Sequence, residues 1–283
     1  MNMLMMDLHI HSTASDGSLS PEEILREACS LGVSPVSITD HDTVAAYVEL
    51  DSAKPASGII PGVELSAEFA GGTLHILGYG IDPFDENLSG ALGELQRFRL
   101  DRNRRIIAAM GRIGFDITFE EVLLEAGGEL IGRPHFASLM VKKGYVKTFR
   151  EAFDRYLKKG APLYMDKKRL LPGEAIGLIR KAGGIAVMAH PWQTGLDRAG
   201  VRALVVSLRE YGLEGLEAFY SQHSEEQTEI CLGFAREFGL IVTAGSDFHG
   251  DIKPEIPLGM RVPLDGLLTF FGALRIKSPD ACS

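Results

Sequence analysis

Several histidines and carboxylates in this sequence are spaced so that they could bind metal ions. The segment Asp7-Leu8-His9-Ile10-His11 alternates polar and apolar residues, so on a β-strand Asp7, His9 and His11 would share one face. Two imidazoles on the same face can bind one metal ion, although a single buried histidine is more often a core residue with a satisfied hydrogen bond. Further residues of these types stand at Asp40, His41, Asp42, Glu64, His75, His190, Asp247 and His249.

Most of these residues lie at or just past the end of an apolar segment that is typical of a β-strand; His75 alone lies within its strand. We expect strands at 4–10, 35–39, 59–65, 73–79, 185–189, 215–218 and 240–244. Because the loops that follow parallel strands converge at one edge of a sheet, the pattern predicts one common site. Imidazole with carboxylate is the ligand set of Zn, Mn or Fe, and the set contains no cysteine for a thiolate site.

The elements that must position these residues follow a repeated strand and helix pattern, which predicts an α/β fold with a largely parallel sheet. The first helix is expected to begin after Ser20, with Pro21 and Glu23 in capping positions, and to end near Gly32. Gly71-Gly72 predicts a hairpin and therefore one antiparallel pair. From about residue 88 to 171 the strand pattern is absent, which predicts an insertion of helices.

The composition is that of a soluble globular protein. The 283 residues are 45% hydrophobic and 24% charged, which excludes a disordered, collagenous or coiled-coil chain. No segment approaches the roughly 18 apolar residues of a membrane span, so we expect a cytoplasmic protein without a membrane partner. Cys29, Cys231 and Cys282 form no CxxC pair and are expected to be reduced thiols.

The charge is unevenly distributed. A formal net charge of −9 disfavours binding to long nucleic acid, which depends on a basic surface. Residues 97–169 nevertheless hold 17 Lys and Arg against 9 Asp and Glu, a local charge of +8. Whether this basic segment is a solvated helix face or a binding surface stays open from the sequence. Its first helix carries Arg97, Arg99, Arg102, Arg104, Arg105 and Arg112.

Taken in order, these motifs resemble the PHP (polymerase and histidinol phosphatase) family of metal-dependent phosphoesterases. The resemblance extends from residue 7 to about residue 260. It implies an α/β fold, a distorted (β/α)7 TIM-like barrel formed by 1–87 and 170–283, with 88–169 as a helical insertion domain. The matching motifs are Asp7-Leu8-His9-Ile10-His11-Ser12, Ser15-Asp16-Gly17, Ile38-Thr39-Asp40-His41-Asp42, Gly62-Val63-Glu64, His75, Ala189-His190-Pro191 and Gly245-Ser246-Asp247-Phe248-His249.

The resemblance implies three divalent ions, with Mn as the expected metal and Fe or Zn as alternatives. A hydroxide bound to metal and held by Glu64, His75 and His190 would attack the phosphate ester. The implied ligands are His9, His11, Glu64 and Asp247 for the first ion, Glu64, His75 and His190 for the second, and Asp16, His41 and His249 for the third.

Within the family, the chain is similar to stand-alone nucleoside 3′,5′-bisphosphate phosphatases and 5′-3′ exoribonucleases with a helical insertion. We therefore expect hydrolysis of the 3′-phosphate of a nucleoside 3′,5′-bisphosphate, and action on short 5′-phosphorylated oligonucleotides. A histidinol-phosphate-type phosphatase, a 5′-3′ exonuclease and a non-catalytic metal-binding regulatory protein remain as alternatives. A C–N hydrolase is less favoured. Uncatalysed hydrolysis of a phosphate monoester is slower than that of an amide, so a cluster of three ions suits the phosphate ester better.

Arg133, His135 and His223 are the predicted phosphate-binding residues. The segment Gly132-Arg133-Pro134-His135 stands at the expected start of a helix, where a guanidinium and free N–H groups suit a phosphate, although a solvated arginine is also common. In the resembled phosphatases the insertion and the loop near His223 close over the substrate. Trp192 could stack on a base or pack, and Phe248 is expected in the core. The oligomeric state and the role of residues after Gly259 stay open.

Overall fold

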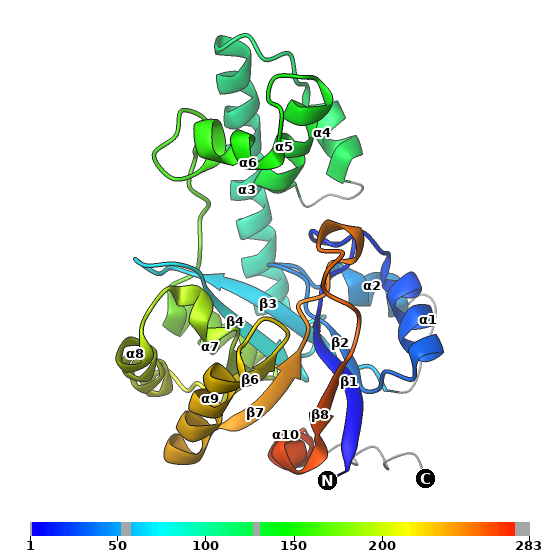
Figure 1. The fold of residues 1–283 in the computed structure, drawn as a ribbon, viewed down its shortest axis with the longest axis vertical. Coiled ribbons are helices and arrows are strands. Elements are labelled where there is room, and N and C mark those ends of the chain that lie inside the picture. Colours follow the sequence, from blue (N-terminus) through cyan, green and yellow to red (C-terminus); the bar gives the residue numbers. More distant parts are fainter. Residues whose placement is uncertain (1, 52–57, 127–130, 275–283) are drawn as a thin grey trace.

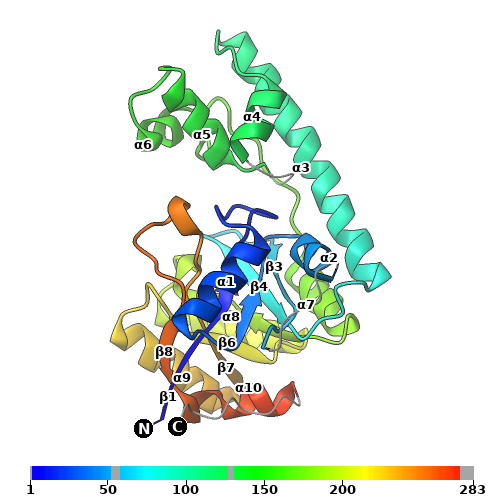
Figure 2. The same cartoon turned by 90° about the vertical axis from the view of Figure 1, so that its right-hand side faces the viewer.

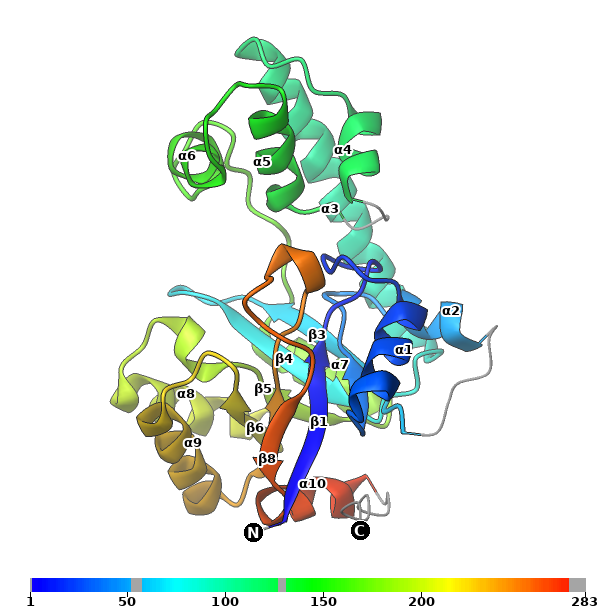
Figure 3. The same ribbon diagram turned by 45° about the vertical axis from the view of Figure 1, so that its right-hand side comes forward.

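The computed structural model describes residues 2–51, 58–126 and 131–274. A mixed α/β body contains the strands, and a group of helices lies above one end of it (Figure 1). The long helix α3 (Glu86–Arg112) runs from the side of the body into this upper group (Figure 2). The loops that follow β1 (Met3–Ile10) and β7 (Ile241–Gly245) emerge at the end of the body beneath the upper helices (Figure 3).

Within the described residues the strands form two sheets, of order β2-β1-β8 and β3-β4-β5-β6-β7. The predicted seven strands are all present, and the hairpin around Gly71-Gly72 joins β3 and β4 as an antiparallel pair. The expectation of a largely parallel sheet was only partly right, because β4 with β5 and β1 with β8 are also antiparallel. The remaining strands are β2 (Val36–Ile38), β3 (Gly62–Ala67), β4 (Leu74–Tyr79), β5 (Ile185–Met188), β6 (Gly215–Tyr220) and β8 (Met260–Pro263).

The two sheets do not close into a continuous barrel in the described chain. The unpredicted strand β8 pairs with Met3–Met6 and so occupies one edge of β1 over its first half. The segment after β7 therefore reaches only the far end of β1, where Ile10 and Phe248 form an isolated bridge and Asp247 N–H donates to His9 O at 2.9 Å. On the other side, β2 and β3 are linked by the isolated bridges Val36 to Ile59 and His41 to Glu64.

The first helix, α1 (Pro21–Leu31), has the predicted boundaries. The Ser20 hydroxyl accepts from Glu23 N–H, the Glu23 carboxylate accepts from Ser20 N–H, and Gly32 ends the helix with a φ of 67°. The other helices of the body are α2 (Ala45–Asp51), α7 (Pro172–Lys181), α8 (Arg198–Glu210), α9 (Glu225–Phe238) and α10 (Leu268–Ala273), with short turns at Pro191–Thr194, Gly250–Ile252 and Leu264–Leu267.

The upper helices form a second hydrophobic core. This part contains α4 (Phe119–Ala126), α5 (Arg133–Lys142), α6 (Phe149–Ala152) and the π-helix Phe153–Leu157. Helix α3 takes part in both cores: Leu88, Leu92 and Leu95 pack in the body, whereas Ile106 and Met110 pack in the upper cluster. With 27 residues the helix is about 40 Å long, so its middle spans the distance between the two cores.

The C-terminal segment whose role the sequence left open completes the core of the body. Phe270 and Phe271 of α10 are buried there, and the Phe270 ring packs edge-on against Tyr79. Phe248 is buried as expected, and Trp192 is partly buried against the same core. Cys29 and Cys231 are free thiols, and Cys282 lies outside the described residues. None of the described helices combines the length and apolar character needed to cross a membrane.

The basic face of α3 is divided between solvent and protein. Arg104, Arg105 and Arg112 are exposed, but Arg102 is buried and Arg99 points at the body. The Arg99 guanidinium donates to Asp42 Oδ2 at 2.6 Å. Lys167, which returns from the upper helices to the body, lies with its ammonium 3.7 Å from the same oxygen. Asp42 thus ties both connections of the upper helices to the body.

Asp42 is held in its ionised form by this arrangement. Burial by itself would raise the pKa of the carboxyl, but Lys167, Arg99 and the Ser66 N–H lower it more, so the pKa lies well below its usual range. A carboxyl with a depressed pKa stabilises the fold above the pKa of the unfolded chain, near 4, and loses this contribution as the pH falls from there toward the folded-state pKa.

We expect Asp42→Asn to lower the free energy of unfolding by about 3 kcal/mol at pH 7, because two largely buried cations lose their partner. Asparagine tolerates the positive φ of 53° at this position, so backbone strain is not added. Urea unfolding at pH 7, 4 and 3 should show the difference shrinking at the lowest pH. Asp116→Asn, at an exposed position, is the control. Equal stability of Asp42→Asn and the unmodified protein at pH 7 would contradict this role.

Candidate metal centre

The carboxylate of Glu64 lies at the centre of five histidines. Glu64 is fully buried in the middle of β3, rather than at the strand end that the sequence predicted, because β3 continues to Ala67. Its Oε1 is 2.7 Å from His75 Nδ1 and 3.0 Å from His190 Nε2. Its Oε2 is 3.3 Å from His9 Nε2, 3.2 Å from His11 Nε2 and 2.9 Å from His41 Nδ1.

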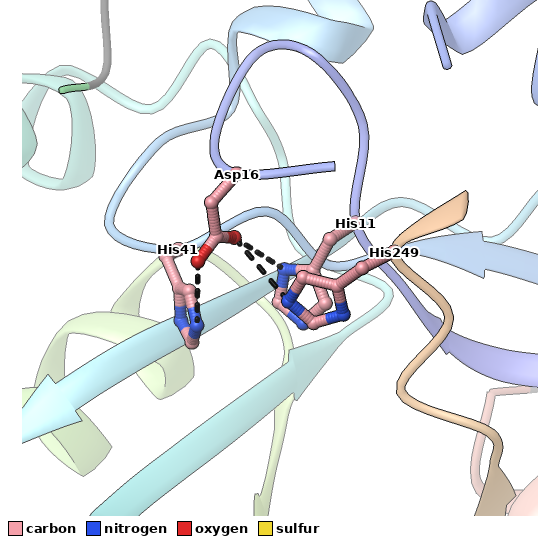
Figure 4. Close-up of side chains that lie close together, drawn as sticks. All are labelled: His11, Asp16, His41 and His249. Atoms are coloured by element: carbon pink, nitrogen blue, oxygen red, sulfur yellow. Dashed lines mark ion pairs between the residues drawn. The ribbon is translucent and has the colours of Figure 1, made fainter. Parts of the chain in front are cut away.

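Asp16 forms a second centre on the loop that follows β1. Its carboxylate points between three imidazoles, as Figure 4 shows. The distances are 3.4 Å from Oδ1 to His249 Nε2, 3.8 Å from Oδ1 to His11 Nδ1 and 3.9 Å from Oδ2 to His41 Nε2. His11 and His41 therefore face both Asp16 and Glu64, which makes the two centres parts of one cluster.

Asp247 is the third carboxylate, and its two oxygens face different surroundings. Oδ1 lies 3.3 Å from His11 Nε2, 3.4 Å from His249 Nδ1 and 3.7 Å from His9 Nε2. Oδ2 accepts hydrogen bonds from the Tyr220 hydroxyl and from Lys253 Nζ, each at 2.8 Å. Burial raises the pKa of Tyr220, so the hydroxyl stays protonated and donates a hydrogen bond to Asp247. Oδ1 is thus turned toward the histidines.

The donor set fits divalent cations. In the described residues, ring nitrogens and carboxylate oxygens of the cluster are buried without a hydrogen-bond partner, which is costly unless a cation binds them. Three groups bring one ligand atom from each member within 4.8 Å of one another: His11, Asp16, His41 and His249; His9, His11 and Glu64; and His41, Glu64 and His75. The unpartnered atoms are His9 Nε2, His11 Nε2, Asp16 Oδ1, His41 Nδ1, Glu64 Oε2 and His190 Nδ1.

The three carboxylates are ionised at neutral pH. Burial alone would raise their pKa values, but attraction to the surrounding histidines outweighs it and holds the pKa of Asp16, Glu64 and Asp247 well below the usual range. Burial lowers the pKa of His75 to about 4, so this imidazole is neutral and has a free electron pair. Three carboxylates together with imidazole nitrogens are the ligand set of a site for hard or borderline divalent ions.

Sequence reasoning missed Glu217, a buried carboxylate that supports the cluster from below. Its Oε1 is 2.9 Å from His9 Nδ1, and its Oε2 accepts from the His190 backbone N–H at 2.7 Å. A carboxylate on the second nitrogen of an imidazole fixes which nitrogen faces a metal. The signal was present in the sequence, because Glu217 stands inside an otherwise apolar strand where a charge needs a partner.

Two further aspartates hold the backbone around the cluster. Asp40 accepts from Ser12 N–H at 2.7 Å and from the Ser15 hydroxyl, which fixes the loop that carries Asp16. Asp7 accepts from Ser246 N–H and Gly259 N–H, each at 2.9 Å. From its spacing, Asp7 was expected to share a face with His9 and His11. Its carboxylate instead anchors the backbone at Ser246 and Gly259.

None of the predicted phosphate-binding residues is a member of the cluster, and each has contacts of its own. Arg133 begins α5, donates to Leu157 O at 3.3 Å and lies over the Tyr164 ring at 5.1 Å. His135 Nδ1 accepts from Gly132 N–H at 3.1 Å. His223 donates to Ala218 O at 3.1 Å and packs against Tyr220, which in turn packs against His190.

Positive charge gathers where the upper helices face the body. Burial, followed by repulsion from Arg99, Arg133 and Arg169, lowers the pKa of Arg102 to about 9. Burial also lowers the pKa of Lys167 to about 8, despite the attraction of Asp42. Arg99 and Lys167 also share the single carboxylate of Asp42, and this concentration of positive charge favours an anionic ligand.

Comparison with known proteins matches the PHP domain family to residues 7–161. A 3′,5′-nucleoside bisphosphate phosphatase of Chromobacterium violaceum is 34% identical over 250 residues, covering 87% of this chain and 88% of the relative. A 5′-3′ exoribonuclease of Haemophilus influenzae is 34% identical over 245 residues, covering 86% and 89%.

Solved structures share the fold over nearly the whole chain. An amidohydrolase from Chromobacterium violaceum with bound sulfate has a TM-score of 0.82 and 31% identity, and 95% of each chain is covered. A protein of Bifidobacterium adolescentis classed as a metal-dependent phosphoesterase has a TM-score of 0.80 and 29% identity, with 94% of this chain and 95% of that chain covered.

We expect Glu217→Gln to weaken Mn²⁺ binding by about 10- to 100-fold, because the amide no longer holds His9 and the His190 backbone as a carboxylate does. Calorimetric titration of the metal-free protein with Mn²⁺ measures the change, and circular dichroism checks the fold. Glu210→Gln, at an exposed position on α8, should bind Mn²⁺ like the unmodified protein. A folded Glu217→Gln protein with unchanged affinity would show that Glu217 has no part in the site.

Proposed function

Because this chain belongs to the PHP domain family and is a metal-dependent phosphoesterase, we propose that it removes the 3′-phosphate from a nucleoside 3′,5′-bisphosphate. The products are a 5′-nucleotide and phosphate. One observation carries the proposal: a cluster of three carboxylates and six histidines lies next to Asp42, against which Arg99 and Lys167 both place a positive charge. A substrate with one phosphate at each centre would use both.

We assign the ligands as three sets, in which Glu64 is shared. Divalent ions bound there supply an activated water and neutralise the phosphoryl oxygens. We propose Mn as the metal, with Fe or Zn as alternatives. The sets are His9, His11, Glu64 and Asp247; Glu64, His75 and His190; and Asp16, His41 and His249.

The protein's contribution is to hold this cluster in a fixed geometry. Glu217 orients His9, and Tyr220 together with Lys253 keeps Asp247 Oδ1 directed at the histidines. Because these groups are buried and already placed, little reorganisation is needed when negative charge develops on the phosphate in the transition state. Lys253 also adds a cation beside the cluster, where it can attract the phosphate group.

We propose that Arg133, His135 and His223 bind the second, non-reacting phosphate, with Arg102 and Lys167 adding positive charge nearby. The proposal is supported by the position of Arg133 at the start of α5, where free backbone N–H groups add donors. Burial lowers the pKa of His135 and the negative charge of Asp16 opposes this shift, which supports a position of this helix end near the cluster. Residues 88–169 would then act as a lid domain over a distorted, open barrel formed by 1–87 and 170–283.

A 5′-3′ exonuclease that acts on short RNA is the second candidate, because a relative of that name has the same level of identity as the bisphosphate phosphatase. A histidinol-phosphate phosphatase is less favoured, since its cationic substrate would meet the cations of the lid. A non-catalytic role is also less favoured, because each proposed ligand position has a His, Asp or Glu.

We expect the purified protein with Mn²⁺ to convert adenosine 3′,5′-bisphosphate to AMP and phosphate. A 5′-phosphorylated short RNA and histidinol phosphate, at equal concentration, are the comparison substrates, and chromatography identifies the products. Stepwise release of mononucleotides from the RNA at a higher kcat/KM would move the assignment to the exonuclease. Release of histidinol alone would overturn the nucleotide substrate.

We expect Arg133→Ala to raise KM for adenosine 3′,5′-bisphosphate about tenfold or more, because a bidentate phosphate contact is lost. KM for an aryl monophosphate should change less than twofold, since it has no second phosphate. Arg105→Ala, at an exposed position on α3, is the matched control. Equal effects of Arg133→Ala on both substrates would refute the proposed contact between Arg133 and the second phosphate.

A further inference from the structure

A cavity of about 650 Å³ lies between the body and the upper helices, next to the metal centre. Thr13 and Ala14, which form part of its wall, stand on the loop between His11 and Asp16. Thr43 forms another part and follows His41 by two residues. The volume is in the range of cavities that bind small organic ligands.

The cavity exists because α3 belongs to two separate cores. Leu95 is the last residue of α3 buried in the body core, and Ile106 is the first buried in the upper core. The turns between them line the cavity with Gln96, Leu100 and Asn103. The distance between the cores therefore creates this space.

The lining offers an apolar surface and hydrogen-bonding groups. Phe119, Leu100 and Leu123 provide the apolar surface. Gln96 provides an amide group, and Arg99, held at 2.6 Å from Asp42, provides a cation on the side of His41. The Asn103 amide is already occupied, because its Oδ1 accepts from Arg102 and its Nδ2 donates to Ile131 O. A flat aromatic ring with polar edges suits such a lining, because its faces need apolar contact and its edges need hydrogen bonds.

We propose that this cavity binds the nucleobase of the substrate, while the scissile phosphate lies at the Glu64 cluster. The inference rests on the proposed function in one respect, that the substrate is a nucleotide. Phe119 supplies the stacking surface, and Gln96 contacts the edge of the base. The cavity therefore selects nucleotides over other phosphate esters, independently of the phosphate contacts.

Gly93 offers a direct way to fill the cavity. It lies on α3 at the cavity wall, and a Cβ built there meets no atom within 4 Å. Gly90, one turn earlier on the same helix, is exposed, does not line the cavity and is equally free of contacts. Gly93→Phe and Gly90→Phe thus make the same chemical change to the helix, but only Gly93→Phe places a ring in the cavity.

The experiment measures binding of AMP and of ribose 5-phosphate, which has no base, to the Mn²⁺-loaded protein by calorimetry. We expect AMP to bind at least tenfold more tightly than ribose 5-phosphate. Gly93→Phe and Phe119→Ala should each remove about tenfold of AMP affinity and leave ribose 5-phosphate unchanged. Gly90→Phe, and Phe149→Ala at an exposed ring of the upper helices, should bind both ligands like the unmodified protein.

Equal affinity of the unmodified protein for the two ligands would overturn the inference, as would equal losses for both ligands in Gly93→Phe and Phe119→Ala. Removing the ring in Phe119→Ala and adding one in Gly93→Phe are opposite changes, so a shared loss specific to AMP is not explained by misfolding. Failure of the proposed function is a separate result. In that case adenosine 3′,5′-bisphosphate is not hydrolysed, although the dependence of binding on the base and on Gly93 persists.

Discussion

One buried carboxylate, Glu64, surrounded by five imidazoles is the constraint on which the rest of the structure depends. Burying a charge is costly unless opposite charge or ligands compensate it, and the compensation must come from several chain segments at once. The histidines come from β1, from the loop after β2, from β4 and from the turn after β5, so these segments must meet at Glu64. Strand β4 runs antiparallel to both of its neighbours and presents His75 to the cluster.

Two further sets of charged side chains surround this centre, one of carboxylates and one of cations. Beneath it, Glu217, Asp7 and Asp40 accept hydrogen bonds from the histidine ring and the backbone that carry the cluster. Above it, the upper helices and the segment that returns from them bring arginines and a lysine, which Asp42 neutralises only in part. A site with anionic ligands below and excess cations above fits a phosphate between them, and this fit is the physical basis of the proposed bisphosphate substrate.

Much of this could be predicted from the sequence, and what could not has physical causes. The seven predicted strands, the caps of α1 and the helical character of the stretch after residue 88 are local patterns, so they were predictable and are confirmed. Strand β8 was missed because four residues that end in a proline give too short a pattern, and it pairs antiparallel with β1 in place of a neighbour from the expected distorted (β/α)7 barrel. The histidines were recognised by their type and position. Glu217 was not recognised, and Asp42 was noted only as a residue that could bind metal. The partners of both are distant in the sequence, and only the folded chain brings them together.

The most direct test of the account is the number of Mn²⁺ ions bound by the protein and by Glu64→Gln, measured by elemental analysis after equilibrium dialysis. If Glu64 is shared between two sets of ligands, the unmodified protein should bind three ions, and the variant should keep only the ion of the Asp16 group. Circular dichroism establishes that the variant is folded. The same number of ions in both proteins would contradict the central role of Glu64.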